Sequence, residues 1–138
     1  MRRIAVAIVF IAREGKYYLQ LRGSDPYKGA AGLIGGFGGK IEPGETAVQA
    51  AKRELEEETS LRISPQRLKE LGDATVISDY QLQPTEVHLT AFLLRLKSSE
   101  TFVATEGSIV ELTKAEAIAK GEAITPGTLA CFKKVVKE

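Results

Sequence analysis

The sequence predicts a protein of mixed α and β structure, in which a mixed sheet carries helices on both faces. Two observations predict this class. Strand-like runs of apolar residues occur in both halves of the chain, and helix-capping patterns occur between and after them. The chain has 138 residues without internal repeats or low-complexity segments. This length predicts one domain over residues 1–138, large enough to bury its own core.

Two strands joined by a tight turn are expected at the start of the chain. Arg3–Ala12 and Lys16–Arg22 are runs of apolar and aromatic residues that flank Arg13-Glu14-Gly15, a pattern typical of a hairpin. The apolar opening could also indicate a signal peptide. However, it runs directly into GKYYLQLR and lacks a cleavage site of small residues, so a core strand is the favoured interpretation.

A glycine-rich loop precedes the clearest helix pattern. The loop glycines let the backbone approach a ligand closely or adopt positive φ. Thr46 is the expected N-cap of a helix over residues 46–60, whose buried stripe is Val48, Ala51 and Leu55. The glycines of the loop are Gly32, Gly35, Gly36, Gly38, Gly39 and Gly44.

Two strands and two helices are expected after this helix. Residues 68–78 and 87–96 have strand patterns, and residues 80–86, which include Pro84, are expected to connect them. Thr113 and Glu116 have the spacing of a capping box. Thr125-Pro126 then begins the last helix, whose core positions are Leu129, Phe132 and Val136.

Composition narrows the class of protein. Cys131 is the only cysteine, so no internal disulfide can form, and a reducing cytoplasmic location with Cys131 as a core residue of the last helix is expected. The formal net charge of +1 argues against broad binding to long nucleic acid. No apolar run is long enough to predict a transmembrane helix.

Three glutamates share one face of the helix predicted over residues 46–60. Glu54, Glu57 and Glu58 stand at i, i+3 and i+4, and about 100° of rotation per residue brings them together. Like charges at this spacing repel, at a cost of about a few tenths of a kcal/mol per pair. A hard divalent cation such as Mg²⁺, or Mn²⁺ in its place, removes this cost because it takes oxygen ligands. The alternative is a solvated acidic helix screened by Lys52 and Arg53.

The loop and helix together resemble the signature of the Nudix hydrolases. Gly39 is followed after five residues by Glu45, and seven further residues lead to the run RELEEE at 53–58 and the apolar Leu61. Ser60 stands where the family usually has glycine, which predicts a modest cost in backbone strain. The resemblance implies a Nudix-type αβα sandwich with a mixed central sheet.

The resemblance also implies which residues hold the metal. The side-chain ligands of the family correspond here to Glu54, Glu57 and Glu58, and a backbone carbonyl just before the motif glycine corresponds to that of Gly38. Some relatives add a ligand from a later loop, where this chain has Glu106. The implied cofactor is Mg²⁺, for which Mn²⁺ can substitute.

The implied catalytic residues are Glu54, Arg53 and Glu45. Glu54 is the first candidate for the general base, and Glu106 or Glu111 would replace it if the base came from a later loop. Arg53 is expected to orient the catalytic carboxylates by bidentate ion pairing, a task that lysine performs poorly. Glu45 is expected near the site, where it tunes or assists the reaction.

Four residues are expected to bind substrate: Arg22, Gly39, Lys40 and Phe37. Arg22 ends the second strand at a position where family members often carry an arginine that faces the nucleotide. Lys40 could meet phosphates. The ring of Phe37 could stack on a base, with core packing as the alternative.

Other residues have weaker patterns. Tyr27 and Tyr80 could also stack on a base, and Lys28 could meet a phosphate. His88 alternates within a strand pattern and is expected to face a neighbouring strand. Gly35 stands where some enzymes that clear oxidised purine nucleotides place an asparagine, so base specificity stays open.

The predicted function is metal-dependent hydrolysis of a nucleoside triphosphate to the monophosphate and pyrophosphate. Substrates such as ADP-ribose, other nucleotide sugars, dinucleoside polyphosphates or capped RNA ends are alternatives. A Nudix-fold module that binds a nucleotide without cleaving it is an alternative of another class. The expected partner is a small nucleotide, and a monomer and a homodimer are both compatible with the sequence.

Overall fold

The computed structural model describes residues 1–23 and 32–137. The elements of this part of the chain are the strands β1 (Arg2–Arg13), β2 (Lys16–Leu21), β3 (Ile34–Gly35), β4 (Phe37–Lys40), β5 (Lys69–Tyr80), β6 (Gln83–Arg95) and β7 (Ser108–Leu112), the α-helices α1 (Ala47–Glu58), α2 (Lys114–Ala119) and α3 (Pro126–Lys134), and the 3₁₀ turns η2 (Pro65–Arg67) and η3 (Gly121–Ala123). None of the described helices is long and apolar enough to cross a membrane.

The sheet is mixed, and β1 is its central strand. The main strand order is β3-β2-β1-β6-β5, with β4 paired to β1 and β7 paired to β2. β1 runs parallel to β6 over its length, whereas β2 and β4 pair with it antiparallel. β4 pairs with residues 6–9 of β1, and β2 pairs with residues 11–13 of the same strand. One long strand therefore connects the glycine-rich segment to the rest of the sheet.

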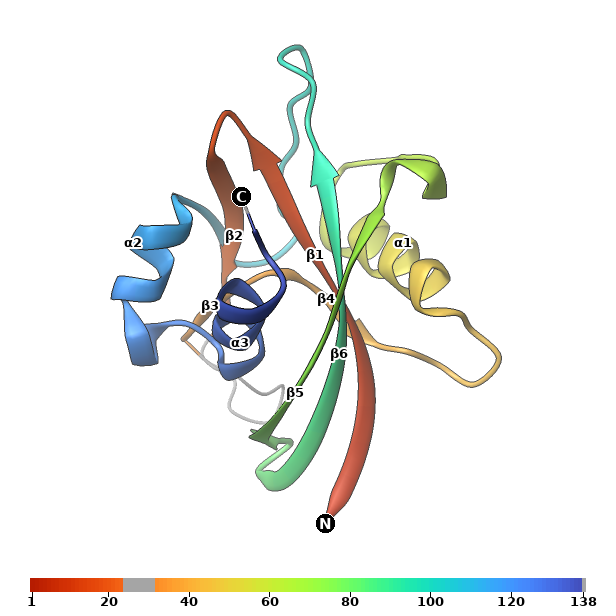
Figure 1. The fold of residues 1–138 in the computed structure, drawn as a ribbon. Helices are drawn as coiled ribbons and strands as arrows, with labels where there is room; N and C mark the ends of the chain where they lie inside the picture. The colour runs from red at the N-terminus through yellow and green to blue at the C-terminus, as the bar shows by residue number, and fades with distance from the viewer. Residues whose placement is uncertain (24–31, 138) are drawn as a thin grey trace.

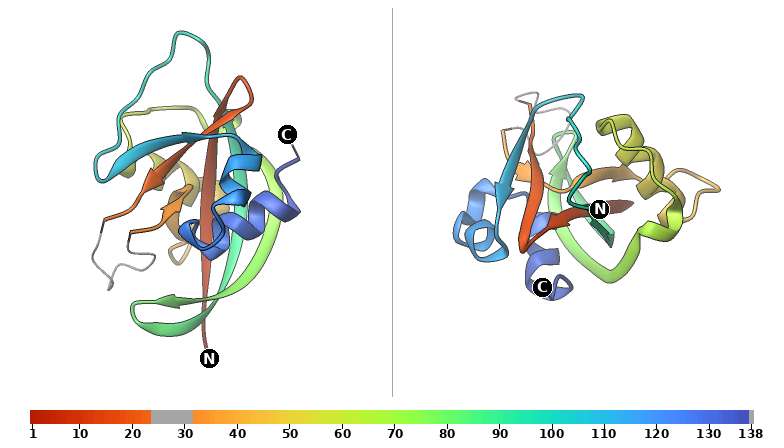
Figure 2. Two further views of the ribbon diagram at one scale, coloured as in Figure 1. Left: turned by 90° about the vertical axis from the view of Figure 1, so that its left-hand side faces the viewer. Right: turned by 90° about the horizontal axis from the view of Figure 1, so that it is seen from above.

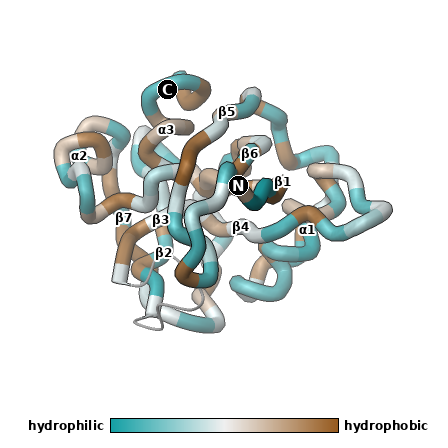
Figure 3. Tube along the Cα trace, turned by 90° about the horizontal axis from the view of Figure 1, so that it is seen from below, coloured by the Kyte–Doolittle hydropathy of each residue, from teal (hydrophilic) through white to brown (hydrophobic). Residues whose placement is uncertain are grey.

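Helices cover both faces of the sheet, which confirms the predicted αβα sandwich. α1 lies on one side, and α2 and α3 lie on the other (Figures 1 and 2). Side chains of β1 alternate between two cores: Ala7, Val9 and Ile11 pack toward α1, whereas Ile8 and Phe10 pack toward α3. In Figure 3, hydrophobic strand segments lie between α1 on one side and α2 and α3 on the other.

The first hairpin is confirmed, and the second is longer than predicted. Glu14 and Gly15 form the first two-residue turn, with φ of 52° and 80°. The expected connection at residues 80–86 is wrong, because β5 continues to Tyr80 and β6 begins at Gln83. Residues 81 and 82 make the turn with positive φ. Pro84 lies in β6 but precedes the part that pairs with β1, where a missing N–H would break the ladder.

Three short strands were not predicted. β3 and β4 lie inside the glycine-rich loop, and β7 lies in the polar stretch before the helix that begins after Thr113. β7 pairs with β2, and β3 pairs with the end of the same strand. Segments of two to five residues carry too little periodicity to be recognised, because their hydrogen bonds depend on partners far away in the chain.

The predicted helices are confirmed with small changes at their ends. Thr46 caps α1 in a capping box with Gln49, and Thr113 caps α2 in a capping box with Glu116. The strain expected at Ser60 is absent, because its φ is not positive. Instead, the Ser60 hydroxyl accepts a hydrogen bond from the N–H of Val103 at 3.0 Å, so serine fits the exit of α1.

In α1 and in α3, the side chains that face the core agree with the sequence pattern. Ala51 and Leu55 of α1 are fully buried, and Val48 is half-buried at the edge of the same core. Cys131 of α3 is fully buried, and burial raises the pKa of its thiol to about 12. A thiol with this pKa stays protonated at neutral pH, which supports its interpretation as a packing residue.

An ion pair between Arg67 and Glu100 connects the turn η2 to the segment after β6. Both N–O distances of this bidentate pair are 2.7 Å, and Glu100 also accepts the N–H of Lys97 at 2.7 Å. The hydrogen bonds from Arg67 and Lys97 lower the pKa of Glu100 to about 2. An acid whose pKa is lowered on folding stabilises the protein above its unfolded pKa and loses this contribution as the pH falls.

Glu100→Gln is therefore expected to lower the free energy of unfolding at pH 7 by about 1–2 kcal/mol, the range for a charged hydrogen-bonded pair that is partly exposed. The difference from the wild type should shrink between about pH 4.5 and about pH 2, where Glu100 itself becomes protonated. Urea unfolding at several pH values measures this. A difference independent of pH would show that the ion pair is not the cause.

Candidate active site

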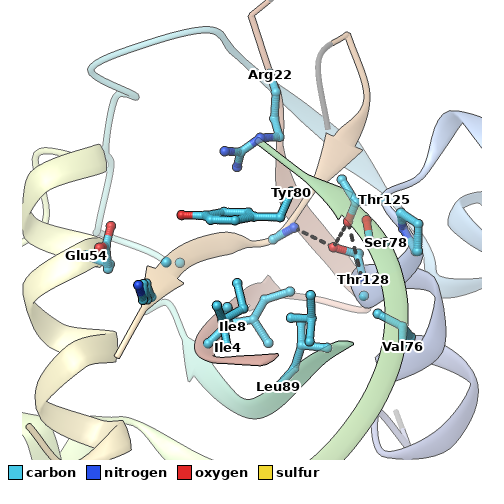
Figure 4. A pocket seen from close by; sticks show the side chains of 18 of the residues that line it. Ile4, Ile8, Arg22, Glu54, Val76, Ser78, Tyr80, Leu89, Thr125 and Thr128 are labelled. Carbon is cyan, nitrogen blue, oxygen red and sulfur yellow. Dashed lines mark hydrogen bonds between the residues drawn. The ribbon is translucent and has the colours of Figure 1, made fainter. Parts of the chain in front are cut away.

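A pocket of about 360 Å³ opens beside the glycine-rich segment, on the face of the sheet that α3 covers only in part. Its floor is apolar and comes from β1, β5 and β6, including Ile4, Ile8 and Leu89 (Figure 4). Its opposite end is charged, because Glu54 and Glu58 of α1 reach it. One pocket therefore joins an apolar surface to an acidic helix.

Of the three glutamates at i, i+3 and i+4 on α1, two line this pocket and one does not. Glu54 and Glu58, one helical turn apart, both line it. Only 16% of the Glu54 side chain is exposed, compared with 57% of the Glu57 side chain. Glu57 lies instead in a shallow groove on the outer side of the helix. Two of the three carboxylates therefore enter the pocket, whereas Glu57 does not, and its role as a metal ligand stays a prediction.

Arg53 links the carboxylates of the loop and the helix. It forms a bidentate pair with Glu45, with N–O distances of 2.7 and 3.0 Å. Its Nη1 donates to Glu54 at 2.9 Å and to Glu57 at 3.4 Å. Its Nη2 also donates to the carbonyl of Lys40 at 3.0 Å. The fork of the guanidinium makes these contacts at once, which an ammonium group could not do.

The charges around Arg53 explain two pKa changes. The hydrogen bond from Arg53 and that from the backbone N–H of Glu42 hold the pKa of Glu45 at about 2. In return, Glu45 raises the pKa of Arg53 above its ordinary value, with smaller contributions from Glu54 and Glu57. Glu45 and Arg53 therefore stay charged at neutral pH and hold the loop before α1 against the helix.

Glu54 and Glu58 are shifted in the opposite direction. Burial, reinforced by the nearby charge of Glu54, raises the pKa of Glu58 to about 8, although the N–H of Gly38 donates to its carboxylate at 2.8 Å. Burial also raises the pKa of Glu54, against the effect of Arg53. Ionising both of these neighbouring carboxylates at once is costly. The pair therefore favours binding of a cation.

Glycine allows β4 to approach both β1 and α1. A Cβ on Gly38 would lie 2.0 Å from the carbonyl oxygen of Ala7. A Cβ on Gly39 would lie 2.5 Å from the carboxyl carbon of Glu54. The missing side chain of Gly39 therefore leaves the room that the Glu54 carboxylate itself occupies.

The donor set of the pocket fits a hard divalent cation in part. In residues 1–23 and 32–137, no three acidic, histidine or cysteine side chains gather closely enough to form a complete metal site. Mg²⁺ does not require one, because it is commonly held by one or two carboxylates together with waters and phosphate oxygens. Glu54 and Glu58, which both line the pocket and have raised pKa values, match that requirement.

The two later glutamates differ in their positions. Glu106 directly follows Thr105, whose N–H donates to the carbonyl of Glu58 at 2.9 Å. The backbone of Glu106 therefore lies near the end of α1, and its role as ligand or base stays a prediction. Glu111 lies in β7 and pairs with Lys16 at 3.8 Å. Glu111 does not line the pocket.

The predicted substrate residues are brought together except for one. Arg22, Gly39 and Lys40 all line the pocket. Phe37 does not, because its ring is fully buried in the core beneath α1 and packs edge to face with Phe102 at 6.1 Å. The prediction that Phe37 contacts substrate is corrected by its burial: in a strand, alternate side chains point to opposite faces, and that of Phe37 points to the core.

Other sequence predictions have clear outcomes as well. Tyr27 and Lys28 lie outside the described residues, whereas Tyr80 lines the pocket. His88 faces the neighbouring strand, where its ring contacts Thr75 and Asp73, each at 3.2 Å. A Cβ on Gly35 would lie 3.0 Å from the side chains of Thr125 and Thr128, so a larger residue there would require these side chains to shift.

Sequence reasoning missed the wall opposite the acidic helix. This wall comes from β5 and from the start of α3, where the Thr128 hydroxyl accepts the N–H of Gly36 at 3.1 Å and receives a hydrogen bond from Thr125 at 2.7 Å. Period-two alternation in β5 could have indicated which side chains share a face. The pairing of these elements across the pocket had no local signal. The missed lining residues are Ile4, Val6, Ile8, Val76, Ser78, Asp79, Val87, Leu89, Thr125, Pro126, Gly127 and Thr128.

Gly39→Ala is expected to lower kcat by about tenfold or more with little loss of stability. The new methyl group would displace the Glu54 carboxylate from its position against Arg53, and a misplacement of about 1 Å can cost about a hundredfold in rate. Steady-state kinetics and thermal unfolding measure the two effects. Gly23→Ala is the control, because a Cβ there meets no atom of residues 1–23 and 32–137 within 4 Å. Equal rates in the two variants would contradict the expectation.

Comparison with known proteins agrees with this geometry. A family model described as the NUDIX domain matches residues 1–128. The solution structure of the E. coli ORF135 protein is similar, with 25% identity, coverage of 96% of this chain and 88% of that chain, and a TM-score of 0.69. The MutT NUDIX hydrolase of Burkholderia pseudomallei has 21% identity, 99% and 100% coverage, and a TM-score of 0.75. The E. coli dihydroneopterin triphosphate pyrophosphohydrolase has 21% identity, 98% coverage of both chains and a TM-score of 0.72. No curated protein matched the sequence.

The αβα fold with an acidic helix behind a glycine-rich strand, together with the match to the NUDIX domain, places the chain among the pyrophosphohydrolases. The match over residues 1–128 shows the particular family: this protein is a member of the Nudix hydrolases. Members of this family act on small nucleotide substrates and generally use divalent metals such as Mg²⁺.

Proposed function

We propose that this protein hydrolyses a nucleoside triphosphate to the monophosphate and pyrophosphate in the presence of Mg²⁺. The observation that carries the proposal is one pocket in which an apolar floor leads to Glu54 and Glu58, with Arg22 and Lys40 beside them. The floor suits the base and sugar, and the charged end suits a cation and a chain of phosphates. The proposal treats residues 1–138 as one domain that works in the cytoplasm.

Arg22 supports a role for phosphate binding. Its Nε is buried and has no hydrogen-bond partner among the described residues. A buried donor without a partner is costly, and an anionic ligand would satisfy it. The guanidinium also lies close enough to lower the pKa of Glu58. In the proposal, Arg22 and Lys40 contact the phosphates, and Lys40 does so from the exposed rim.

In the proposal, the acidic side chains bind the cation and accept a proton. Glu54 and Glu58, with the carbonyl of Gly38, would hold the cation, and Glu57 and Glu106 are further candidate ligands. The bound cation would lower the pKa of water and stabilise charge on the phosphate oxygens. Glu54 would accept the proton of the attacking water, and Arg53 would keep Glu54 in place through the hydrogen bond at 2.9 Å.

The test is product analysis with Mg²⁺ and with Mn²⁺. The panel contains nucleoside triphosphates, oxidised purine triphosphates, ADP-ribose and other nucleotide sugars, and dinucleoside polyphosphates. Release of pyrophosphate from triphosphates, lost on chelation and in Glu58→Gln, is the expected result. Cleavage confined to nucleotide sugars or dinucleoside polyphosphates would replace the proposed substrate. Metal-dependent binding without cleavage of any compound would favour a nucleotide-binding module.

A further inference from the structure

We propose that Tyr80 stacks on the base of the bound nucleotide and that Arg2 is the positioning residue that holds its ring. The inference deepens the proposed function and rests on it, because it requires a nucleotide in this pocket. It names the part of the ligand that this end of the pocket recognises: an aromatic ring, as distinct from a chain of phosphates.

Tyr80 lies at the end of β5, on the face of the strand that lines the pocket. Val76, Ser78 and Tyr80 alternate along β5, and all three line the pocket, while Ile77 between them is 62% exposed. Figure 4 shows the Tyr80 ring extending from β5 across the pocket, with its hydroxyl end on the side of Glu54. An aromatic ring is thus placed above the apolar floor and beside the charged end.

Arg2 fixes this ring from outside the pocket. The Arg2 guanidinium carbon lies 5.2 Å from the centroid of the Tyr80 ring, which is the geometry of a cation–π contact. Its Nη2 donates to the carbonyl of Tyr80, and its Nε donates to the hydroxyl of Thr85 at 3.3 Å. Arg2 does not line the pocket. The arginine therefore holds both the backbone and the ring of Tyr80 and leaves ring surface available to a ligand.

The backbone of the second hairpin also restricts Tyr80. Tyr80 pairs with Gln83 across a two-residue turn, and the turn residues Gln81 and Leu82 have φ of 52° and 63°. Such values are uncommon for residues other than glycine, asparagine and aspartate. A conformation of this kind persists where its surroundings hold it in place, and it is frequent next to binding sites. Here the adjoining contacts are those of Arg2 with Tyr80.

The side chains that line the pocket suit a base at this position. The floor below the ring is formed by aliphatic side chains, among them Ile4, Ile8 and Leu89. An aromatic base on such a floor gains stacking against the Tyr80 ring, a contact available to every base because each has a π face. The phosphates of the same molecule would then point to Glu54 and Glu58 at the other end.

The first experiment compares Tyr80→Leu with Tyr80→Phe. We expect Tyr80→Leu to raise KM for ATP by about tenfold with kcat changed by less than about threefold, as for loss of one stacking contact. Tyr80→Phe should stay within about threefold of the wild type in both constants. The inhibition constant of inorganic tripolyphosphate, which has no base, should be the same in all three proteins. An unchanged KM for ATP, or an equal loss for ATP and tripolyphosphate, would overturn the inference.

The second experiment separates positioning by Arg2 from a general effect on stability. Arg2→Met keeps an extended side chain without the guanidinium and is expected to raise KM for ATP by about threefold to fivefold. In the Tyr80→Leu background the same change should have no effect, because the ring that Arg2 holds is absent. Additive effects in the double variant would overturn the role of Arg2. Ile77→Ala, on the outward face of β5, is the control and should leave both constants unchanged.

A binding experiment keeps the inference testable if no triphosphate is cleaved. The chain has no tryptophan, so Tyr80→Trp introduces a single tryptophan, excited selectively, as the fluorescent reporter at the proposed contact. Titration with AMP should quench its fluorescence to saturation, whereas ribose 5-phosphate, which lacks a base, should not. Quenching by AMP without any turnover of triphosphates would retain the stacking role and reject the proposed reaction. Equal quenching by both ligands, or by neither, would reject the stacking role.

Discussion

Replacing Glu58 by glutamine is expected to lower kcat by at least about a hundredfold while the fold stays intact. Glutamine keeps the size of the side chain and can still accept the hydrogen bond from Gly38, but it removes the charge that a divalent cation requires. Steady-state kinetics with saturating Mg²⁺ would measure the loss, and circular dichroism would report on the fold.

The helix offers a matched control for this variant. Glu56 lies on the same helix but pairs with Lys52 outside the pocket, so Glu56→Gln should keep kcat within about twofold. Glu57→Gln tests the third carboxylate, which contacts Arg53 but is mostly exposed; the role implied by the family predicts a loss of the same order as for Glu58. Full activity in Glu58→Gln would contradict the assignment of the metal site.

The same substitution is expected to stabilise the metal-free protein at alkaline pH. The pKa of Glu58 is raised to about 8 in the folded state from an ordinary value of 4.5. The folded protein thus binds a proton that the unfolded chain has released. The contribution of Glu58 to the stability is therefore largest below about pH 4.5 and falls as the pH rises toward 8.

Each pH unit in this interval contributes about 1.4 kcal/mol per proton, so the expected loss for the wild type is on the order of 2–4 kcal/mol. Glu58→Gln should have a much shallower slope, because its side chain does not ionise. The measurement is urea unfolding in EDTA at about pH 5, 6.5 and 8. Addition of Mg²⁺ should restore the stability of the wild type at pH 8 and change the variant little. Parallel slopes for the two proteins would show that ionisation of Glu58 does not limit stability.

The predictions for kcat and for stability both depend on the cost of ionising the buried carboxylates of α1. A buried carboxylate is costly to ionise without a counter-ion, and Glu58 has a second carboxylate, Glu54, as its neighbour. Arg53 is directed to Glu45, Glu54 and Glu57 and has no hydrogen bond to Glu58. The site consequently gives up stability in its metal-free form, and this stability would be regained when a cation binds.

The acidic helix could be predicted in detail because its signals are local. The N-cap at Thr46, the buried stripe through Ala51 and Leu55, and the shared face of the glutamates follow from the 3.6-residue period of a helix. The first hairpin followed in the same way from Glu14-Gly15 between two alternating runs. The resemblance of this segment to the Nudix signature then led to the family, which the match over residues 1–128 confirmed.

The sequence by itself determined the helix that carries the carboxylates, the strands of the first hairpin and the family of the protein. The tertiary structure alone decided that Phe37 faces the core, that Glu58 is buried while Glu57 is exposed, and that Tyr80 and Thr128 complete the pocket. The physical reason is the range of the interactions. Helix periodicity and turn geometry act between neighbouring residues, whereas burial and the walls of a pocket depend on the register of β1 against β6 and β4 and on the part of the sheet that α3 leaves uncovered.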